Sequence, residues 1–302
     1  MTFSIVAFDK DANEVGFAIS SCCWNAGSVC SAEAGKGVIT HQAQGITKFH
    51  PIFFEQLKEK KDLEDILDHF RIIDDHIESR QIGFVSFEKG TSLAFTGKNC
   101  SFWAGHKTGE NYACQGNILV GPEVINAMTH AFECTEGNLI DKLYAALYAG
   151  EGAGGDARGK QSARLLVKSV SDNAKDDNIV IVDFNIIDHE DPINEIGRLL
   201  TVRQNYREIA AMNKKFEQVQ TAKERKAILV EILNFMKDKK ESRYMSTWTN
   251  LGYAFYSMDC IDEAVYCYKT VFEISPTMVK TIKEAAKSVG VPDSVMKKIM
   301  EK

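Results

Sequence analysis

Thr2 is the first residue in the chain whose position suggests chemistry. It follows Met1 and opens the strand-like run 2–8. Removal of an initiator methionine is favoured when the next residue is small, and it would leave Thr2 with a hydroxyl and a free α-amine. Because an α-amine has a reference pKa of about 8, it can act as a general base for that hydroxyl near neutral pH. Thr2 therefore offers a nucleophile and its base in one residue, although a threonine at this position is common.

A glycine-rich segment at 154–160 is the second candidate, because it approaches the phosphate-loop pattern G-x-x-x-x-G-K-[ST]. Gln161 replaces the Ser or Thr that would bind magnesium, and the preceding segment is helical in character, whereas a phosphate loop follows a strand. These departures argue against nucleotide hydrolysis. The glycines around Asp156 and Arg158 still permit close approach of the backbone to a ligand.

Histidine and cysteine patterns indicate neither a metal site nor a conventional catalytic triad. No two of the seven His occur at i and i+4 around a glutamate, and His106 stands alone in the string Trp103-Ala-Gly-His106. The eight Cys form no C-x-x-C pair, and no Gly-x-Ser-x-Gly string is present. We therefore expect structural histidines, reduced thiols and no metal or other cofactor.

Charge divides the chain into two parts. Residues 1–197 carry 17 basic and 29 acidic residues, and residues 198–302 carry 19 and 13. The acidic first part argues against binding of nucleic acid, which requires a basic surface. No run approaches the roughly 18 apolar residues of a membrane helix, and the first residues lack the basic leader of a secretory signal. We expect a soluble, cytoplasmic protein that binds neither nucleic acid nor membrane.

The hydrophobic pattern predicts the elements that must position these residues. Up to residue 187, alternating apolar residues favour strands and a 3.6-residue period favours helices. The predicted strands are 2–8, 15–20, 37–42, 82–87, 93–95, 163–170 and 178–187, and the predicted helices are 51–58, 63–76, 122–132 and 139–147. This order predicts antiparallel sheets between two helical layers.

Beyond Asp191-Pro192 the pattern is helical to the end of the chain. Thr221 and Glu224 form a capping box that opens one helix. The segment 245–278 has the spacing of a tetratricopeptide (TPR) repeat, a 34-residue helix-turn-helix. The matching residues are Trp248, Leu251, Gly252, Phe255, Ala264, Tyr268, Val271 and Pro276. A helical hairpin without a binding function remains the alternative.

Long gapped strings in this chain resemble those of a known bacterial family. They are Met1-Thr-Phe-Ser-Ile-Val-Ala, Phe95-Thr-Gly with Cys100, Trp103-Ala-Gly-His106, Gly109, Tyr112, Gln115-Gly-Asn117, Leu119 and Gly121, Gly154-Gly-Asp-Ala-Arg-Gly-Lys-Gln-Ser-Ala163, and Asp188-His-Glu-Asp-Pro192. The family is catalogued as domain of unknown function 1028 and is placed among the N-terminal nucleophile (Ntn) hydrolases. The resemblance covers residues 1 to about 205 and implies a four-layer αββα sandwich like that of proteasome subunits.

The resemblance also implies roles for individual residues. Thr2 takes the position of the nucleophile, and the predicted loop Gln115-Gly116-Asn117 takes that of the oxyanion-stabilising groups. Asp156 to Gly159 resembles the Asp-containing turn before a late strand. Two departures stand out: Ser20 or Ser21 occupies the place of an aspartate, and Glu33 and Lys36 lie near the place of the catalytic lysine in an uncertain register.

We therefore expect an Ntn-type α+β domain over 1–200 and an all-helical domain over 201–302. The expected function is hydrolysis of an amide or peptide-like bond, with Thr2, Asn117 and Asp156 as catalytic residues. Glu33, Gln115, Gly116 and Arg158 are the expected substrate contacts, and Asp156 and Arg158 either orient the site or hold a substrate carboxylate. The alternative is a non-catalytic Ntn fold that binds a small ligand or assembles as a homo-oligomer, with a protein partner at the TPR-like segment.

Overall fold

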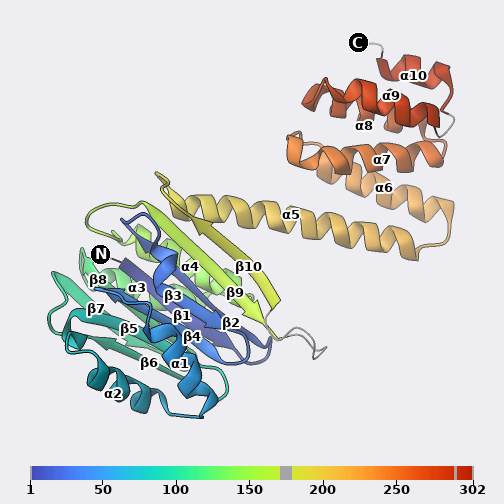
Figure 1. Cartoon of the computed structure of the whole chain (residues 1–302). Coiled ribbons are helices and arrows are strands. Elements are labelled where there is room, and N and C mark those ends of the chain that lie inside the picture. The colour runs from blue at the N-terminus through green and yellow to red at the C-terminus, as the bar shows by residue number, and fades with distance from the viewer. Residues whose placement is uncertain (1, 171–178, 289–290, 301–302) are drawn as a thin grey trace. The chain divides into compact units, whose positions relative to one another are not determined.

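The chain divides into two units, Met1–Thr201 and Val202–Lys302. The structure, a computed structural model, describes residues 2–170, 179–288 and 291–300 (Figure 1). Met1, on whose removal the Thr2 hypothesis depends, lies outside the described residues, as does Asn178 at the start of the last predicted strand.

The first unit contains two antiparallel sheets. The larger sheet has the order β10-β9-β2-β1-β8-β7 and the smaller one the order β3-β4-β5-β6. The strands are β1 Thr2–Asp9, β2 Glu14–Ser21, β3 Cys30–Glu33, β4 Gly37–Ala43, β5 Arg80–Ser86, β6 Thr91–Thr96, β7 Trp103–Thr108, β8 Tyr112–Leu119, β9 Ser162–Ser169 and β10 Ile179–Ile186. The helices are α1 Phe49–Lys58, α2 Leu63–Ile73, α3 Glu123–Cys134 and α4 Leu139–Gly152, with short 3-10 turns η1 Ala26–Val29 and η2 Ile77–Ser79.

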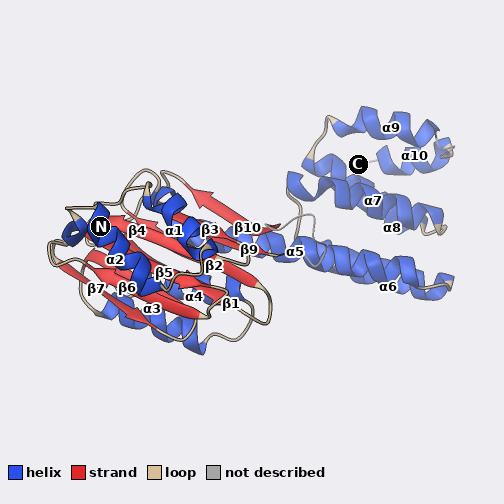
Figure 2. Ribbon diagram, turned by 60° about the horizontal axis from the view of Figure 1, so that its bottom comes forward, coloured by secondary structure: helices blue, strands red, loops and turns tan. Residues whose placement is uncertain are grey.

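Alternation along the strands explains how the layers pack. In β1, Phe3 and Ile5 face the core formed with α3 and α4, whereas Val6 and Phe8 face the core between the two sheets. The outer face of the smaller sheet packs on α1 and α2 through a third core that includes Phe84. Helices therefore cover both outer faces and the inner faces meet (Figure 2), which confirms the predicted α+β architecture with antiparallel sheets.

Three strands, β3, β7 and β8, were absent from the predicted elements. The segment Gln115-Gly116-Asn117, expected to be a loop, lies within β8. Its inward face carries Gln115 and Asn117, so the apolar alternation that marks a half-buried strand is missing. Strand β7 is an edge strand with exposed His106 and Lys107, and such a strand carries little apolar pattern.

The second unit is all-helical. Its elements are α6 Ala222–Met236, η3 Ser242–Tyr244, α7 Met245–Ser257, α8 Ile261–Ile274, α9 Met278–Ser288 and α10 Asp293–Met300, and α5 Pro192–Gln218 begins in the first unit. The capping box is present, with the Glu224 N–H donating to Thr221 Oγ1 at 3.2 Å. Helices α7 and α8 form a hairpin in which a Cβ on Gly252 would lie 3.1 Å from the Tyr268 ring. No described helix is both long and apolar enough to cross a membrane.

Candidate active site

Strand register brings the predicted nucleophile to one end of the larger sheet. Thr2 is the Cα partner of Asn117 on β8, and Phe3 is the partner of Ser20 on β2. The start of β1 therefore lies between the last residues of β2 and β8. Because paired residues point to the same face, Thr2 and Asn117 both face the space between the sheets.

The Asp156 turn spans this end of β1. The Cys22 N–H, just after β2, donates to Asp156 Oδ2 at 2.9 Å, and Asp156 forms an antiparallel bridge with Leu119 at the end of β8. The Arg158 N–H donates to Asp156 Oδ1 at 2.9 Å, and Arg158 Nη2 lies 3.2 Å from Oδ2. The Asp156 side chain is 1% exposed and that of Arg158 is 46% exposed. Asp156 thus joins the ends of the two strands that flank β1, through its carboxylate to the residue after β2 and through its backbone to β8, and its carboxylate pairs with a half-exposed guanidinium.

The hydroxyl of Thr2 is half-buried beside a second hydroxyl. Thr2 Oγ1 and Ser21 Oγ lie 3.1 Å apart, and Ser21 is 1% exposed. From the smaller sheet, Gln42 Nε2 donates to the Thr2 carbonyl oxygen at 3.1 Å. The smaller sheet therefore holds the Thr2 carbonyl through Gln42, and strand β2 holds the Thr2 hydroxyl through Ser21.

A buried amide network fixes the orientation of Asn117. Gln81 Nε2 donates to the carbonyl oxygens of Gly116 (2.7 Å) and Gly105 (3.1 Å). Because a carbonyl oxygen only accepts, the Gln81 oxygen must face the other way, where it accepts from Gln42 Nε2 (2.7 Å) and Asn117 Nδ2 (3.0 Å). Asn117 is 1% exposed, and its Oδ1 has no hydrogen-bond partner among the described residues. One N–H and the oxygen of this side chain thus remain beside Thr2.

Ile118, next to Asn117, marks this strand end as strained. Its φ is +53°, and the pairing with β7 shifts register opposite it, between Trp103 and Ala104. A β-branched residue in the left-handed region is an outlier that costs about 1–3 kcal/mol. Bulges of this kind reorient neighbouring side chains and occur beside active sites. No sequence pattern indicated this feature, since isoleucine is poorly suited to that conformation.

The structure does not bring the other predicted contacts to a surface near Thr2. Gln115 is fully buried and its Nε2 donates to Ser4 Oγ at 2.6 Å. Gly116 lies inside the sheet, paired on one side with Phe3 and on the other with Gly105. Both residues sit in the interior of the sandwich, so their placement supports the network rather than a substrate contact.

Glu33 lies at the other end of the sandwich. It pairs with Gly37 at the start of β4, whereas Gln42, which contacts Thr2, lies five positions further along that strand. At about 3.3 Å per residue this separates them by roughly 17 Å. The Glu33 carboxylate instead forms an ion pair with Lys36. The resemblance to the family leaves the alignment of Glu33 and Lys36 with the catalytic lysine uncertain, and strand pairing shows that they do not lie near Thr2.

Chemically, this end of the sheet offers hydroxyl, amide and guanidinium groups around one buried carboxylate. Among the residues described, no three or more His, Cys, Asp and Glu side chains come together in a way that could hold a metal ion. The arrangement is suited to attack by a hydroxyl and to hydrogen bonding of a polar substrate, provided that a base acts on Thr2.

These features define a class: mixed α+β proteins with two facing antiparallel sheets and a hydroxyl residue at the start of a central strand. The chain belongs to the family of unknown function DUF1028, whose model matches residues 2–196. It is similar to the crystal structure of protein SPO2555 from Silicibacter pomeroyi, also a DUF1028 protein, with 27% identity and a TM-score of 0.59. That match covers 66% of this chain and 88% of the other. No curated protein sequence matches the chain. The family expected from the sequence is thereby confirmed.

Proposed function

We propose that the first unit is an Ntn hydrolase that cleaves an amide or peptide-like bond, with Thr2 as nucleophile once Met1 is removed. The observation that carries this proposal is the Thr2 hydroxyl, 3.1 Å from Ser21 Oγ, at the start of a central strand that the buried Asp156 turn spans. Two facing sheets between helix pairs are also what an Ntn sandwich requires.

The proposed reaction uses the free α-amine of Thr2 as the base. The amine accepts the hydroxyl proton while Oγ1 attacks the substrate carbonyl, and the proton then passes to the departing amine. Water hydrolyses the resulting ester and regenerates the hydroxyl. The second N–H of Asn117 Nδ2 is the preferred oxyanion donor, because the Asn117 side chain faces the same side of the sheet as its partner Thr2, whereas Gly116 offers only backbone within the sheet. Asp156 and Arg158 orient the turn above the nucleophile.

The first test requires no substrate. Protein made in its native host should have an intact mass lower by one methionine, and periodate should convert its amino-terminal threonine to an aldehyde, since this reagent cleaves adjacent amine and hydroxyl groups. A form that retains Met1 serves as the matched control and should not react. Retention of Met1 in the native host would refute the mechanism.

Variants of Thr2 test the role of its hydroxyl once an amide substrate is found. Thr2→Ala should abolish turnover with little change in stability, because a residue at a strand end contributes little core area. Thr2→Ser should retain part of the activity, and Thr2→Cys some of it. Full activity of Thr2→Ala, with its identity confirmed by mass, would leave the family membership as a statement about fold alone.

A second function, peptide binding by a TPR-like helical unit, is favoured by a specific cavity. A space of about 220 Å³ between α7, α8, α9 and α10 is lined by Tyr253, Tyr256 and Tyr268 among apolar residues. Peptides selected by display on the full chain should bind more weakly to Tyr253→Ala, measured by fluorescence anisotropy, and equally to the exposed control Val230→Ala on α6. Equal binding to both variants would refute this function.

A further inference from the structure

Two connections that pass between the larger and the smaller sheet flank the end of the sandwich where Thr2 lies. Residues 22–29 lead from β2 to β3, and residues 97–102 lead from β6 to β7. The pairs Ser21 with Ser162, Gln81 with Thr96 and Trp103 with Leu119 place both connections at the Thr2 end. Each connection carries a large aromatic residue with a highly exposed side chain.

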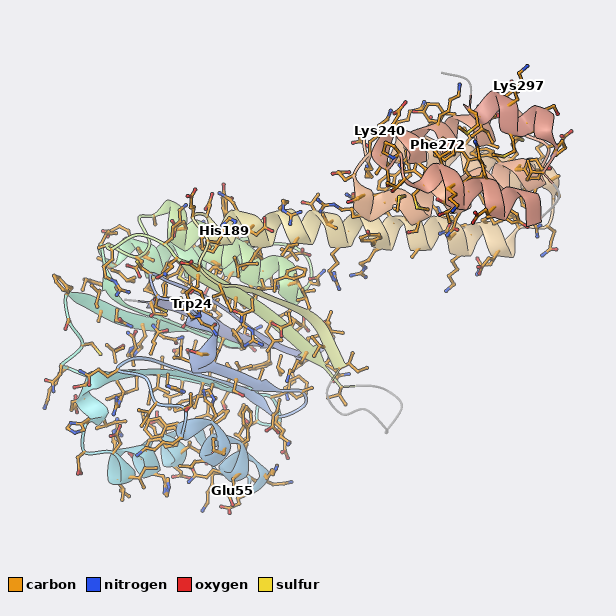
Figure 3. All side chains as sticks on the ribbon, turned by 45° about the horizontal axis from the view of Figure 1, so that its top comes forward. Trp24, Glu55, His189, Lys240, Phe272 and Lys297 are labelled. Carbon is orange, nitrogen blue, oxygen red and sulfur yellow. The ribbon has the colours of Figure 1, made fainter. Side chains whose placement is uncertain are left out.

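These aromatic residues are Trp24, 63% exposed, and Phe102, 84% exposed. Val120, 55% exposed, follows Leu119 at the end of β8, beside the Asp156 turn. We name these three residues the apolar rim; Trp24 is labelled in Figure 3. Strand β2 is adjacent to β1 and β7 is two strands away on the other side. Because Ser162 on β9 holds the backbone on both sides of Trp24, and β9 lies next to β2, the rim spans about 19 Å across four strand spacings, with Thr2 between its two aromatic ends.

The backbone holds the rim in place. On either side of Trp24, Ser162 Oγ donates to the Cys23 carbonyl oxygen (2.7 Å) and accepts from the Ala26 N–H (2.8 Å). In the other connection, the Asn99 N–H donates to the Glu78 carbonyl oxygen (2.8 Å). Because the backbone beneath these exposed aromatic rings is already fixed, less conformational entropy is lost when a ligand binds, as in a preorganised binding site.

Phe102 adds a second observation. Its φ is +56° and its ring is almost fully exposed, so the ring gains almost no burial that would offset the unfavourable backbone conformation. Bulky residues in the left-handed region are outliers that occur at ligand clamps and switches. Asp156 and Arg158, the charged residues of the turn that spans this end of β1, pair with each other, so they favour a ligand without net charge at this position.

From this arrangement we infer that the site takes uncharged amides with a large apolar, aromatic group on each side of the scissile bond, one held by Trp24 and the other by Phe102 and Val120. The inference rests on the proposed hydrolase function for the identity of the scissile bond. It follows from the position of Thr2 between the two ends of the rim, because a carbonyl presented to its hydroxyl extends toward both.

Binding tests the inference separately from turnover. Full-length Thr2→Ala protein is titrated by calorimetry with N-(2-phenylethyl)phenylacetamide, which has a ring on each side, and with N-methylphenylacetamide, which has one. Burial of an additional ring should strengthen binding by about tenfold or more. Of Trp24→Ala and Phe102→Ala, the variant at the amine-side ring should lose most of that preference, and the variant at the shared acyl-side ring should weaken both amides by a similar factor. Ile72→Ala, an exposed apolar residue on α2 (79%), should retain it.

The outcomes separate this inference from the proposed function. The inference that the apolar rim binds two rings would be overturned by equal affinity for the two amides, by no binding of either, or by an unchanged preference in both aromatic variants. Circular dichroism melting of each variant verifies folding. If processed wild-type protein hydrolyses small amides without any ring preference, the hydrolase function is supported and ring binding by the apolar rim is refuted. Rim-dependent binding without hydrolysis by processed protein would support the binding site and refute the nucleophile.

Discussion

Replacing Gln81 with methionine should loosen the centre of the first unit while leaving its packed volume nearly unchanged. The Gln81 side chain is fully buried. Its amide contacts Gly105 O, Gly116 O, Thr96 Oγ1, Gln42 Nε2 and Asn117 Nδ2. At about 1 kcal/mol net for each hydrogen bond, with some loss of additivity, the substitution should cost about 4 kcal/mol.

Hydrogen exchange followed by mass spectrometry measures this cost locally. Amides of β1 and β8 should exchange at least about a hundredfold faster in Gln81→Met, since about 1.4 kcal/mol corresponds to a factor of ten. The helical unit of the same molecules is an internal reference and should not change. Gln44→Met, at an exposed position just after β4, is the matched control. Exchange within tenfold of wild type in β1 and β8 would show that the network does not hold Thr2 and Asn117.

Further substitutions test other parts of the structure. Asp156→Ala removes the buried carboxylate that accepts from two partly buried backbone N–H groups and should cost about 2–3 kcal/mol in urea unfolding, whereas Asp183→Ala, which loses a partly exposed ion pair, should cost under about 1 kcal/mol; equal losses would contradict the role of the turn. Burial lowers the pKa of His41 to about 3, so the unfolded chain binds the proton first and stability should fall as the pH drops below about 6.5, by about 1.4 kcal/mol at pH 5.5. His41→Gln should lose this part of the pH dependence, and an unchanged dependence would refute it. Gly252→Val should lower the melting temperature of the helical unit, because its Cβ meets the neighbouring helix, whereas Gly152→Val, with open space around it, should have little effect; similar effects at both positions would contradict close packing of α7 and α8.

Local patterns in the sequence determined much of the architecture. Alternation in β1 and β2 specified which side chains face each core, and the Thr221 capping box specified the start of α6. These features depend on residues that are neighbours along the chain, and their periods and caps act over one or two turns or strand repeats. The α7–α8 hairpin also depends on residues close together in the chain, because Gly252 on α7 permits close approach of the next helix.

The site depended on contacts that no local pattern contains. Gln42, Gln81 and Asn117 come from three strands far apart in the sequence, and only strand pairing and sheet packing bring their amides into one network. The same pairing placed Glu33 at the far end of the sandwich, because register fixes which residues share a sheet end. The sequence by itself thus determined most of the elements, the family and Thr2 as a candidate. Tertiary structure decided which side chains surround Thr2, because strand order and register are set by burial summed over the whole core.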